Sequence, residues 1–304
     1  MKLTKHQIEQ VCRELNENLI SFSFLAKGNH NSNYFLETAK NKYVIRVEDN
    51  RQFKNLKKEF EFLKIEKSRL GPRAILFDAS HKIISNDYFV EEFIDGKHPS
   101  EKHPTDDFVI QMARWLKKLH KTTKKASKPY LLRTAVKPYY KRYLKYKNNI
   151  KDKELKEKLS HNISKALKIL EKNNTIFANR KIISLLHNDT SSGNVFYKSG
   201  HVRLIDWEFV NYGLPERELS YFLDSYRLTK KQERLFLKNY GYPNTKKANI
   251  QLNIAYIILL LASIGYSLWR LEILRKSKAL KKDKAKRVKR LRRDINLLEE
   301  KINL

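Results

Sequence analysis

Five residues in one short segment have the chemistry that a phosphoryl-transfer site needs. The segment, residues 184–208, reads SLLHNDTSSGNVFYKSGHVRLIDWE in a chain of 64 Lys and Arg against 33 Asp and Glu. The five residues are His187, Asp189, Asn194, Asp206 and Glu208. One carboxylate can orient an attacking hydroxyl, while an amide and a second carboxylate can hold Mg²⁺. Any one of them could merely cap a turn or end a strand, but the five together favour a site.

Short apolar runs on both sides position this segment. We interpret IISLL, VFYK and VRLIDWE as short strands, which places Asp189 and Asn194 on a loop between strands, and Asp206 closes the last strand. Side chains alternate along a strand, so we expect Asp206 and Glu208 to lie on one face. There both carboxylates could approach a metal or a cationic substrate.

The first part of the chain predicts three strands, a helix and two more strands. A short amphipathic helix is expected before them, over residues 4–18, and a polar loop at residues 28–33 separates the first two strands. The helix that follows the third strand should present one apolar face, formed by Phe53, Leu56, Phe60 and Leu63. AILFD and KIISNDYFVEEFI follow as strands, with a hinge near residues 91–97.

The remaining patterns are mainly helical. Residues 254–269 are apolar over 16 positions, which is shorter than the roughly 20 of a membrane span and favours a buried core helix. The basic segment that follows carries an apolar stripe of Val288, Leu291, Ile295, Leu298 and Ile302. Three alternatives stay open for it: packing on its own domain, a homodimer seam, or a basic arm on an anionic membrane surface.

Composition limits the class of protein. The formal net charge of +31 would attract polyanions such as nucleic acid or anionic lipid, although a generally basic surface is the simpler interpretation. Cys12 is the single cysteine, which excludes an internal disulfide and a cysteine-based zinc cluster. The N-terminus is too polar for a signal peptide, so we expect a cytoplasmic protein.

Several motifs together resemble one family. HNDTSSGNVFY and LIDWEF are similar to the catalytic and metal-binding motifs of the choline/ethanolamine kinase family (LicA-like), within the aminoglycoside phosphotransferase and protein-kinase-like superfamily. KGNHNSNYFL, YVIRV, KKEFEFL, FVEEFIDG and MARWLKKLH extend the resemblance from about residue 24 to residue 270. It implies an α+β, two-lobed protein-kinase-like fold. The expected parts are an N-lobe (1–95) with an antiparallel sheet and one helix, a larger, mainly helical C-lobe (96–274) and a basic helical extension (275–304).

The resemblance also implies roles for individual residues, with ATP and Mg²⁺ as cofactors. Asp189 would orient the acceptor hydroxyl, Asn194 and Asp206 would bind Mg²⁺, and His187 would support the catalytic loop. The ATP-binding residues would be Arg46, Glu59, Gly28, Asn31, Glu91 and Phe93. Arg46 suits phosphate because its guanidinium is a planar fork, and Glu59 would orient it.

The acceptor implied by the resemblance is choline or ethanolamine. A quaternary ammonium is recognised by aromatic faces and carboxylates, and the candidates here are Glu208, Tyr266, Trp269 and Tyr212. Three departures leave the acceptor open: Tyr266 stands where Trp is usual, Glu218 where Asp is usual, and the loop after Gly28 lacks a second glycine. The alternatives are a kinase for an aminoglycoside, an amino sugar or another alcohol, and an inactive kinase-like protein tethered to anionic lipid or RNA by its basic tail.

Overall fold

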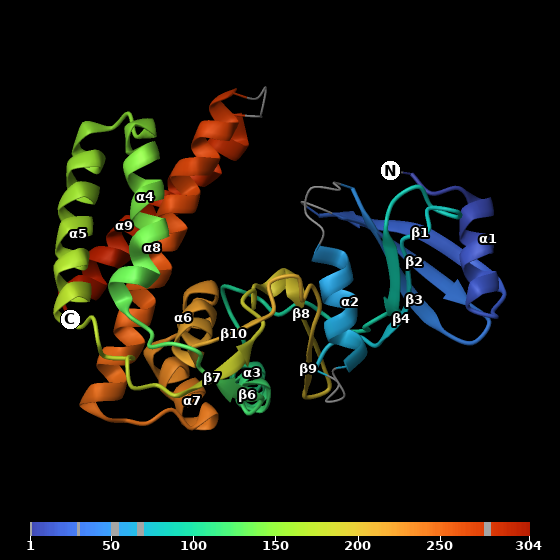
Figure 1. Ribbon diagram of the computed structural model, residues 1–304, viewed down its shortest axis with the longest axis horizontal. Helices are drawn as coiled ribbons and strands as arrows, with labels where there is room; N and C mark the ends of the chain where they lie inside the picture. Colours follow the sequence, from blue (N-terminus) through green and yellow to red (C-terminus); the bar gives the residue numbers. More distant parts are fainter. Residues whose placement is uncertain (1, 29–30, 50–54, 66–69, 277–280) are drawn as a thin grey trace. The chain divides into compact units, whose positions relative to one another are not determined.

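The structure is a computed structural model that describes residues 2–28, 31–49, 55–65, 70–276 and 281–304 (Figure 1). The chain forms two compact units. The first consists of residues 1–119, 187–211 and 225–240, and the second of residues 120–186, 212–224 and 241–304. The predicted loop residues 29–30, Phe53 of the predicted helix face, and residues 277–280 of the basic segment lie outside the described residues. The lobe boundaries at 95/96 and 274/275 stay predictions.

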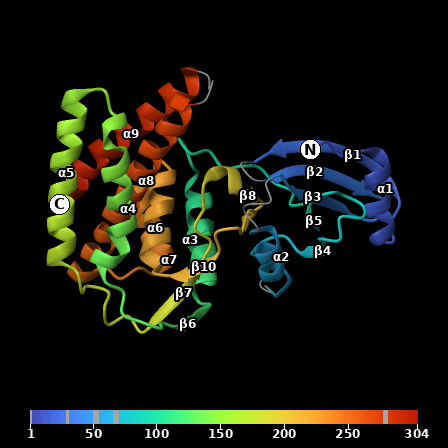
Figure 2. The ribbon, with the colours of Figure 1, turned by 45° about the horizontal axis from the view of Figure 1, so that its top comes forward.

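The first unit is built on a five-stranded antiparallel sheet in the order β1-β2-β3-β5-β4 (Figure 2). Its elements are α1 (Lys5–Glu14), β1 (Leu19–Lys27), β2 (Asn31–Thr38), β3 (Lys42–Glu48), α2 (Asn55–Ile65), β4 (Ala74–Asp78) and β5 (Tyr88–Glu92). The predicted order of three strands, one helix and two strands is confirmed. β4 covers the predicted AILFD, whereas β5 is shorter than predicted, because residues 82–86 form bends before it begins.

Alternation along β3 and β5 sorts side chains between the two faces of this sheet. Ile45 of β3 and Val90 of β5 belong to the apolar core that includes Ile8 and Val11 of α1. Arg46, the neighbour of Ile45, therefore lies on the opposite face, where it contacts Glu59 of α2. One sheet thus separates an apolar core from a charged site.

The rest of the first unit includes the segment from His187 to Asn211. Its elements are α3 (Asp106–His120, the last residue belonging to the second unit), the 3₁₀ helix η3 (Ser192–Asn194), β8 (Val195–Lys198), β9 (His201–Leu204) and α7 (Lys230–Tyr240). β8 and β9 pair as an antiparallel hairpin. The loop between sheet and hairpin is held by a pair of hydrogen bonds between the backbones of Lys97 and Tyr197.

The second unit is mainly helical. Its elements are β6 (Thr123–Lys125), α4 (Leu132–Tyr146), the 3₁₀ helix η2 (Lys147–Asn149), α5 (Lys153–Lys172), β7 (Ile182–Leu186), β10 (Asn211–Gly213, which begins in the first unit), α6 (Pro215–Ser225, which ends in the first unit), α8 (Lys246–Lys276) and α9 (Lys281–Ile302). β10, β7 and β6 form a small sheet in that order. α4, α5, α8 and α9 lie side by side (Figures 1 and 2).

The apolar segment predicted as a core helix lies in α8. This is one helix among the described residues that is long and apolar enough to cross a membrane, and 61% of its most apolar 18-residue window is buried inside the protein. Ile257, Leu260, Ile264 and Leu268 are fully or almost fully buried. The burial favours a core helix over a membrane span.

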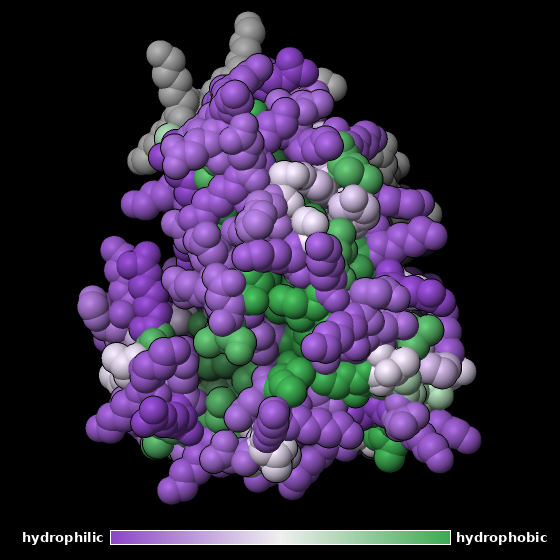
Figure 3. Space-filling view, turned by 90° about the vertical axis from the view of Figure 1, so that its left-hand side faces the viewer, coloured by the Kyte–Doolittle hydropathy of each residue, from purple (hydrophilic) through white to green (hydrophobic). Residues whose placement is uncertain are grey.

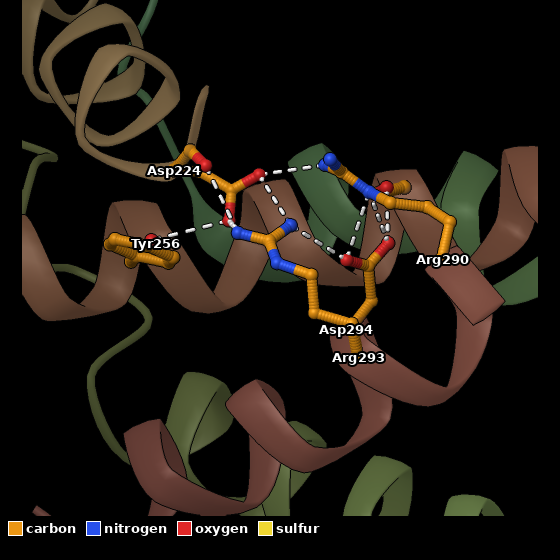
Figure 4. Close-up of polar contacts among 6 residues, drawn as sticks. Asp224, Tyr256, Arg290, Arg293 and Asp294 are labelled. Carbon is orange, nitrogen blue, oxygen red and sulfur yellow. Dashed lines mark hydrogen bonds and ion pairs between the residues drawn. The ribbon is translucent and has the colours of Figure 1, made fainter. Parts of the chain in front are cut away.

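α9 packs against α8 and α5 and is fixed by a buried ionic network (Figure 4). Arg293 donates to both carboxylate oxygens of Asp224 at the end of α6, and Arg290 donates to the same carboxylate at 2.7 Å. Asp294 accepts from both arginines and from Ser263 of α8. Of the three alternatives for the basic segment, packing on its own domain therefore describes α9.

The surface on the α5 side of the molecule is mostly hydrophilic (Figure 3). Apolar side chains are gathered near the middle of this view and are surrounded by polar ones. Between α4 and α5 a hollow of about 390 Å³ is lined by Val136, Tyr140 and Leu167 together with basic side chains. The hydrophilic surface fits the composition of 32% charged residues.

Candidate active site

His187 fixes the loop that follows β7. Its side chain is fully buried beside the indole of Trp207, with 4.4 Å between ring centroids. The backbone N–H of Asp189 donates to Nδ1 at 3.2 Å, so Nε2 carries the proton and donates to the carbonyl of Ile205 at 3.1 Å. The ring thus joins the Asp189 loop to the segment before Asp206, and both of its nitrogens are used in doing so.

A second pair of hydrogen bonds joins Asn194 to the same two segments. The Asn194 amide donates to the backbone carbonyl of Asp189 at 3.3 Å, and the N–H of Ile205 donates to the carbonyl of Asn194 at 3.0 Å. Asn194 ends the 3₁₀ helix η3 on the predicted loop between strands. The structure therefore brings together Asp189 and Asn194, which are five residues apart along the chain. Both lie near Ile205, the residue before Asp206.

The predicted strand geometry of Asp206 and Glu208 is wrong. β9 ends at Leu204, Asp206 has a left-handed backbone with φ of 66°, and Glu208 begins a turn. Because the alternation of side chains holds only in an extended strand, a shared strand face cannot be assigned to these two carboxylates. Asp206 instead directs a half-buried carboxylate to the sheet of the first unit.

Arg46 lies among three carboxylates. Its Nη1 is 2.5 Å from Oε1 of Glu59 on α2 and 3.9 Å from Oε1 of Glu91 on β5, while its Nη2 donates to Asp206 at 3.0 Å. Arg46, Glu59 and Glu91 are all buried. The predicted pair of Arg46 and Glu59 thus forms, and two further carboxylates surround the guanidinium.

This charge balance shifts the pKa values of the buried groups. Burial raises the pKa of Glu91 to about 8 and that of Glu59 to about 7, with Arg46 opposing both shifts. Burial acts to lower the pKa of Arg46, but the three carboxylates together hold it above its ordinary value. Glu59 has hydrogen-bond donors in Arg46 and in the N–H of Trp207 at 2.7 Å, whereas Glu91 is 3.9 Å from its nearest cation. We therefore assign the proton to Glu91 at neutral pH.

The other predicted ATP-binding residues lie on the same sheet. Glu91 is the fourth residue of β5, and its backbone faces Val44 of β3 and Ala74 of β4. The N–H of Phe93 donates to the carbonyl of Lys42, so this donor already has a partner within the sheet. Gly28 precedes β2, and its N–H donates to the carbonyl of Asn31 at 2.8 Å.

Trp207 is a positioning residue that the sequence interpretation did not assign. Its backbone N–H donates to Glu59, and its indole N–H donates to the carbonyl of Leu204. The ring is fully buried and stacks on Phe62 of α2, with 4.9 Å between centroids. A tryptophan directly after a candidate metal-binding aspartate was the available signal.

The predicted substrate aromatics lie in the second unit. The rings of Tyr266 and Trp269 are adjacent on α8, with 5.5 Å between centroids. The guanidinium of Arg287 lies 5.2 Å from the centroid of Tyr266, and that of Arg142 lies 6.0 Å from the centroid of Trp269. Each of the two rings therefore already has a cation beside one of its faces.

Tyr212 and Glu218, which the sequence also singled out, each lie beside a basic side chain. Tyr212 on β10 lies under the ammonium group of Lys124, 4.4 Å from its ring centroid. Glu218, which stands where the resemblance has Asp, is fully buried and lies 2.8 Å from Nε2 of His120. The longer side chain at position 218 thus still reaches a histidine partner within the same unit.

A magnesium site would use few protein ligands here. Among the described residues, no group of three or more His, Cys, Asp and Glu is arranged to hold a metal ion. Mg²⁺ commonly takes one or two carboxylates and completes its shell with water and phosphate, so this absence is compatible with a nucleotide-bound ion. The hard oxygen atoms of Asp206 and Asn194 fit it, and so does the excess of carboxylates over guanidinium around Arg46.

Comparison with known proteins decides the family. A family model described as "Phosphotransferase enzyme family" matches residues 21–247, which is most of the chain. The chain belongs to this phosphotransferase enzyme family. The match includes the Arg46 cluster and the loop from His187 to Glu208, whereas Tyr266 and Trp269 lie beyond the matched residues.

Three relatives of this phosphotransferase show what it resembles. A protein named "Protein LicA homolog" from Metamycoplasma hominis is 27% identical over 150 residues, 49% of this chain and 55% of the relative, so the match spans about half of each. The choline kinase LicA from Streptococcus pneumoniae has a TM-score of 0.62 at 18% identity, covering 96% of this chain and 98% of that one. A spectinomycin phosphotransferase solved with ADP and spectinomycin has a TM-score of 0.62 at 14% identity and full coverage of both chains. The solved structures confirm the two-lobed, protein-kinase-like α+β fold.

Proposed function

We propose that this phosphotransferase moves the γ-phosphate of ATP to the hydroxyl group of choline or ethanolamine. The observation that carries the proposal is the joining of two segments at Ile205: His187 and Asn194 both bond to its backbone and so tie the Asp189 loop to the segment before Asp206. Phosphoryl transfer depends mainly on positioning and charge stabilisation, and this arrangement supplies both.

Each residue then has a separate task. Asp189 orients the acceptor hydroxyl and takes its proton, with its backbone held by His187 and Asn194. Asp206 and Asn194 would hold Mg²⁺, which supplies charge neutralisation at the phosphates when it is bound. Arg46, held by Glu59, is placed to bind phosphate oxygens with the guanidinium edge that Asp206 contacts. The backbone near Glu91 to Phe93 remains our proposal for the adenine contact.

Choline is favoured because two aromatic rings lie together on α8 and because one relative is named as a LicA homolog. Tyr266 and Trp269 would contact the trimethylammonium group, with Glu208 and Tyr212 as further candidates. Phosphorylation of cytosolic choline or ethanolamine also fits our proposal that the chain works in the cytoplasm.

A second candidate is a kinase for a different acceptor, such as an aminoglycoside or an amino sugar. The observation that supports it is that Arg287 and Arg142 already lie beside Tyr266 and Trp269, so these rings need not form a choline site. A guanidinium beside an aromatic ring competes with a quaternary ammonium for the electron-rich face of that ring. The similar structure solved with spectinomycin also supports this candidate.

The test is ADP release from Mg-ATP in the presence of choline, ethanolamine, sugars and aminoglycosides. Asp189→Asn should lower turnover by about 10²- to 10⁴-fold while nucleotide affinity and melting temperature stay close to wild type. Asp283→Asn, at an exposed carboxylate of α9, is the matched control and should leave turnover unchanged. Wild-type turnover in Asp189→Asn would refute the assignment of the base, and unchanged Mg-ATP affinity in Asp206→Ala would refute the metal site.

A further inference from the structure

A basic cavity lies in the first unit, apart from the proposed active site. Its volume is about 800 Å³, which is within the range of small-molecule sites. The ends of β4 and β5, one side of α3, and the β8–β9 hairpin form its walls. Among the described residues, no side chain assigned to catalysis, ATP or metal lines it, although Glu92 of the lining belongs to the segment whose backbone we propose for the adenine contact.

The charge of the lining is strongly one-sided. The basic side chains are Arg73, Arg114, Lys118, His201 and Arg203. Glu92 is the one carboxylate among the described lining residues, so the four permanent cations exceed the anions by three. Like charges that share a concave wall repel each other, and a bound anion removes that repulsion.

Arg203 is a fixed part of this wall. Its Nη1 and Nη2 each donate to one oxygen of Glu92 at 2.9 Å, and Nη2 also donates to the carbonyl of Gly71 at 2.6 Å. Arg73 shares Glu92, with its Nε 3.6 Å from Oε2. A single carboxylate is therefore divided between two guanidinium groups, which leaves positive charge in a preorganised position.

Two buried donors of the lining have no acceptor among the described residues. They are Nε of Arg203 and the indole N–H of Trp115, a residue that is 6% exposed. A buried donor without a partner is costly, and such donors are uncommon in folded proteins. The same cavity thus combines excess positive charge with unused hydrogen-bond donors.

We propose that this cavity is a binding site for a small molecule that carries one or more phosphate groups. The planar forks of Arg73 and Arg114 match phosphate oxygens, and Lys118 adds a point charge. Arg203, whose fork is held by Glu92 and the carbonyl of Gly71, adds fixed positive charge to the wall. The concave shape and the volume select a small ligand over an extended polymer. The inference concerns a second site and does not depend on the acceptor of the phosphotransferase reaction.

The test is calorimetric titration with inorganic tripolyphosphate, using the full chain without nucleotide at physiological ionic strength. Arg114→Ala combined with Lys118→Ala should weaken the binding event by about tenfold or more, since two charge-assisted contacts are lost. Lys117→Ala combined with Lys121→Ala removes the same charge from exposed positions that do not line the cavity, and should change the affinity by less than about twofold. Melting temperatures should agree among the three proteins.

Three results would overturn the inference. No binding by the wild-type chain would exclude the site. An equal loss in both double variants would show a diffuse attraction to the net charge of +31. Unchanged affinity in the Arg114 and Lys118 variant would place the anion elsewhere, for example at Arg46. None of these measurements uses turnover, so a failure of the proposed reaction and a failure of this site are distinguishable.

Discussion

At the residue scale, the decisive feature is a permanent cation that is shared by several acids. A guanidinium keeps its proton even when it is buried, so Arg46 can bind Glu59 and Asp206 at the same time. A lysine could lose its proton in this environment and presents no fork. Glu91 adds a third acid that the guanidinium does not contact closely, and burial raises its pKa to about 8, so we assign the buried proton to it.

Glu91→Gln should flatten the dependence of stability on pH. Between the ordinary carboxyl pKa of 4.5 and about 8, the folded wild-type chain holds a proton on Glu91 that the unfolded chain has released. Stability from this group is thus fully present below about pH 4.5 and is lost as pH rises through about 8. Glutamine stays neutral, so the free energy of unfolding of the variant should rise relative to that of wild type as pH increases. Urea unfolding between pH 5 and 8.5 measures this difference.

The matched control is Glu61→Gln on α2, where the carboxylate is largely exposed. Its unfolding free energy should follow wild type at every pH. A parallel pH profile for Glu91→Gln and wild type would contradict the protonation of Glu91 and would assign the proton to Glu59 instead.

At the element scale, α9 is an integral part of the second unit. Asp224 and Asp294 are almost fully buried, and their charges are balanced by Arg290 and Arg293 (Figure 4). Leu291, Ile295 and Leu298 are also buried. Removal of residues 275–304 would therefore expose an apolar face and two buried carboxylates, so the role of the basic segment has to be tested with point substitutions.

Arg293→Ala should destabilise the chain by about 2 to 3 kcal/mol, because it leaves two buried carboxylates with a single guanidinium. The value is set below that of a fully buried pair, since the Arg293 side chain is 38% exposed. Lys289→Ala, on the exposed side of the same helix, should change stability by less than about 0.5 kcal/mol. Denaturant unfolding compares the two, and equal losses would show that the network contributes little.

Arg287→Ala should lower the KM for choline if Tyr266 binds the acceptor. The substitution removes the guanidinium that lies beside the tyrosine ring, and that face then becomes available to a quaternary ammonium. Cation–π contacts at partly exposed sites contribute about 0.5–1 kcal/mol, so a two- to fivefold decrease is expected. Lys286→Ala, the exposed neighbour, is the control. An unchanged KM would remove Tyr266 from the proposed substrate site.

Helices and strands with a regular spacing of apolar residues could be predicted from the sequence. Elements that exist only through pairing with a segment distant in the sequence could not. α1, the five-stranded sheet and α2 follow apolar spacing over many residues, and they appear in the predicted order. β6 is three exposed residues long and exists only because it pairs with β7, so no local pattern marks it. The positive φ of Asp206 likewise depends on its surroundings and ended the predicted strand early.

Within the site, the sequence predicted identities better than distances. The predicted pair of Arg46 and Glu59 forms, and Asp189 and Asn194 lie together on one loop; each of these residues lies in a short, distinctive run of sequence. The approach of Glu91 to Arg46 was missed, although a carboxylate inside the apolar run YFVEE was a signal of a buried partner. Asp294 is a similar case: this carboxylate lies next to Ile295 of the apolar stripe of α9, and it is buried.

At the scale of the whole molecule, positive charge is a general property of the surface. The chain has 64 basic residues, whereas the exposed side of α9 accounts for only a few of them. Such a surface attracts polyanions through diffuse electrostatics that weaken steeply with salt. The alternative of a dedicated tether requires that α9 contribute more than its share of the attraction.

Replacement of Lys284, Lys286 and Lys289 by Glu should reduce retention on anionic vesicles no more than the same change at Lys165, Lys168 and Lys172 of α5. All six lysines are exposed on their helices, so each set removes the same charge without disturbing the buried network. Equal shifts in the salt concentration that releases the protein would follow from a diffuse field, which depends on total charge. A selective loss with the α9 set would instead identify a lipid-binding face. Turnover measured in parallel should be unchanged in both sets, because none of these lysines belongs to the proposed active site.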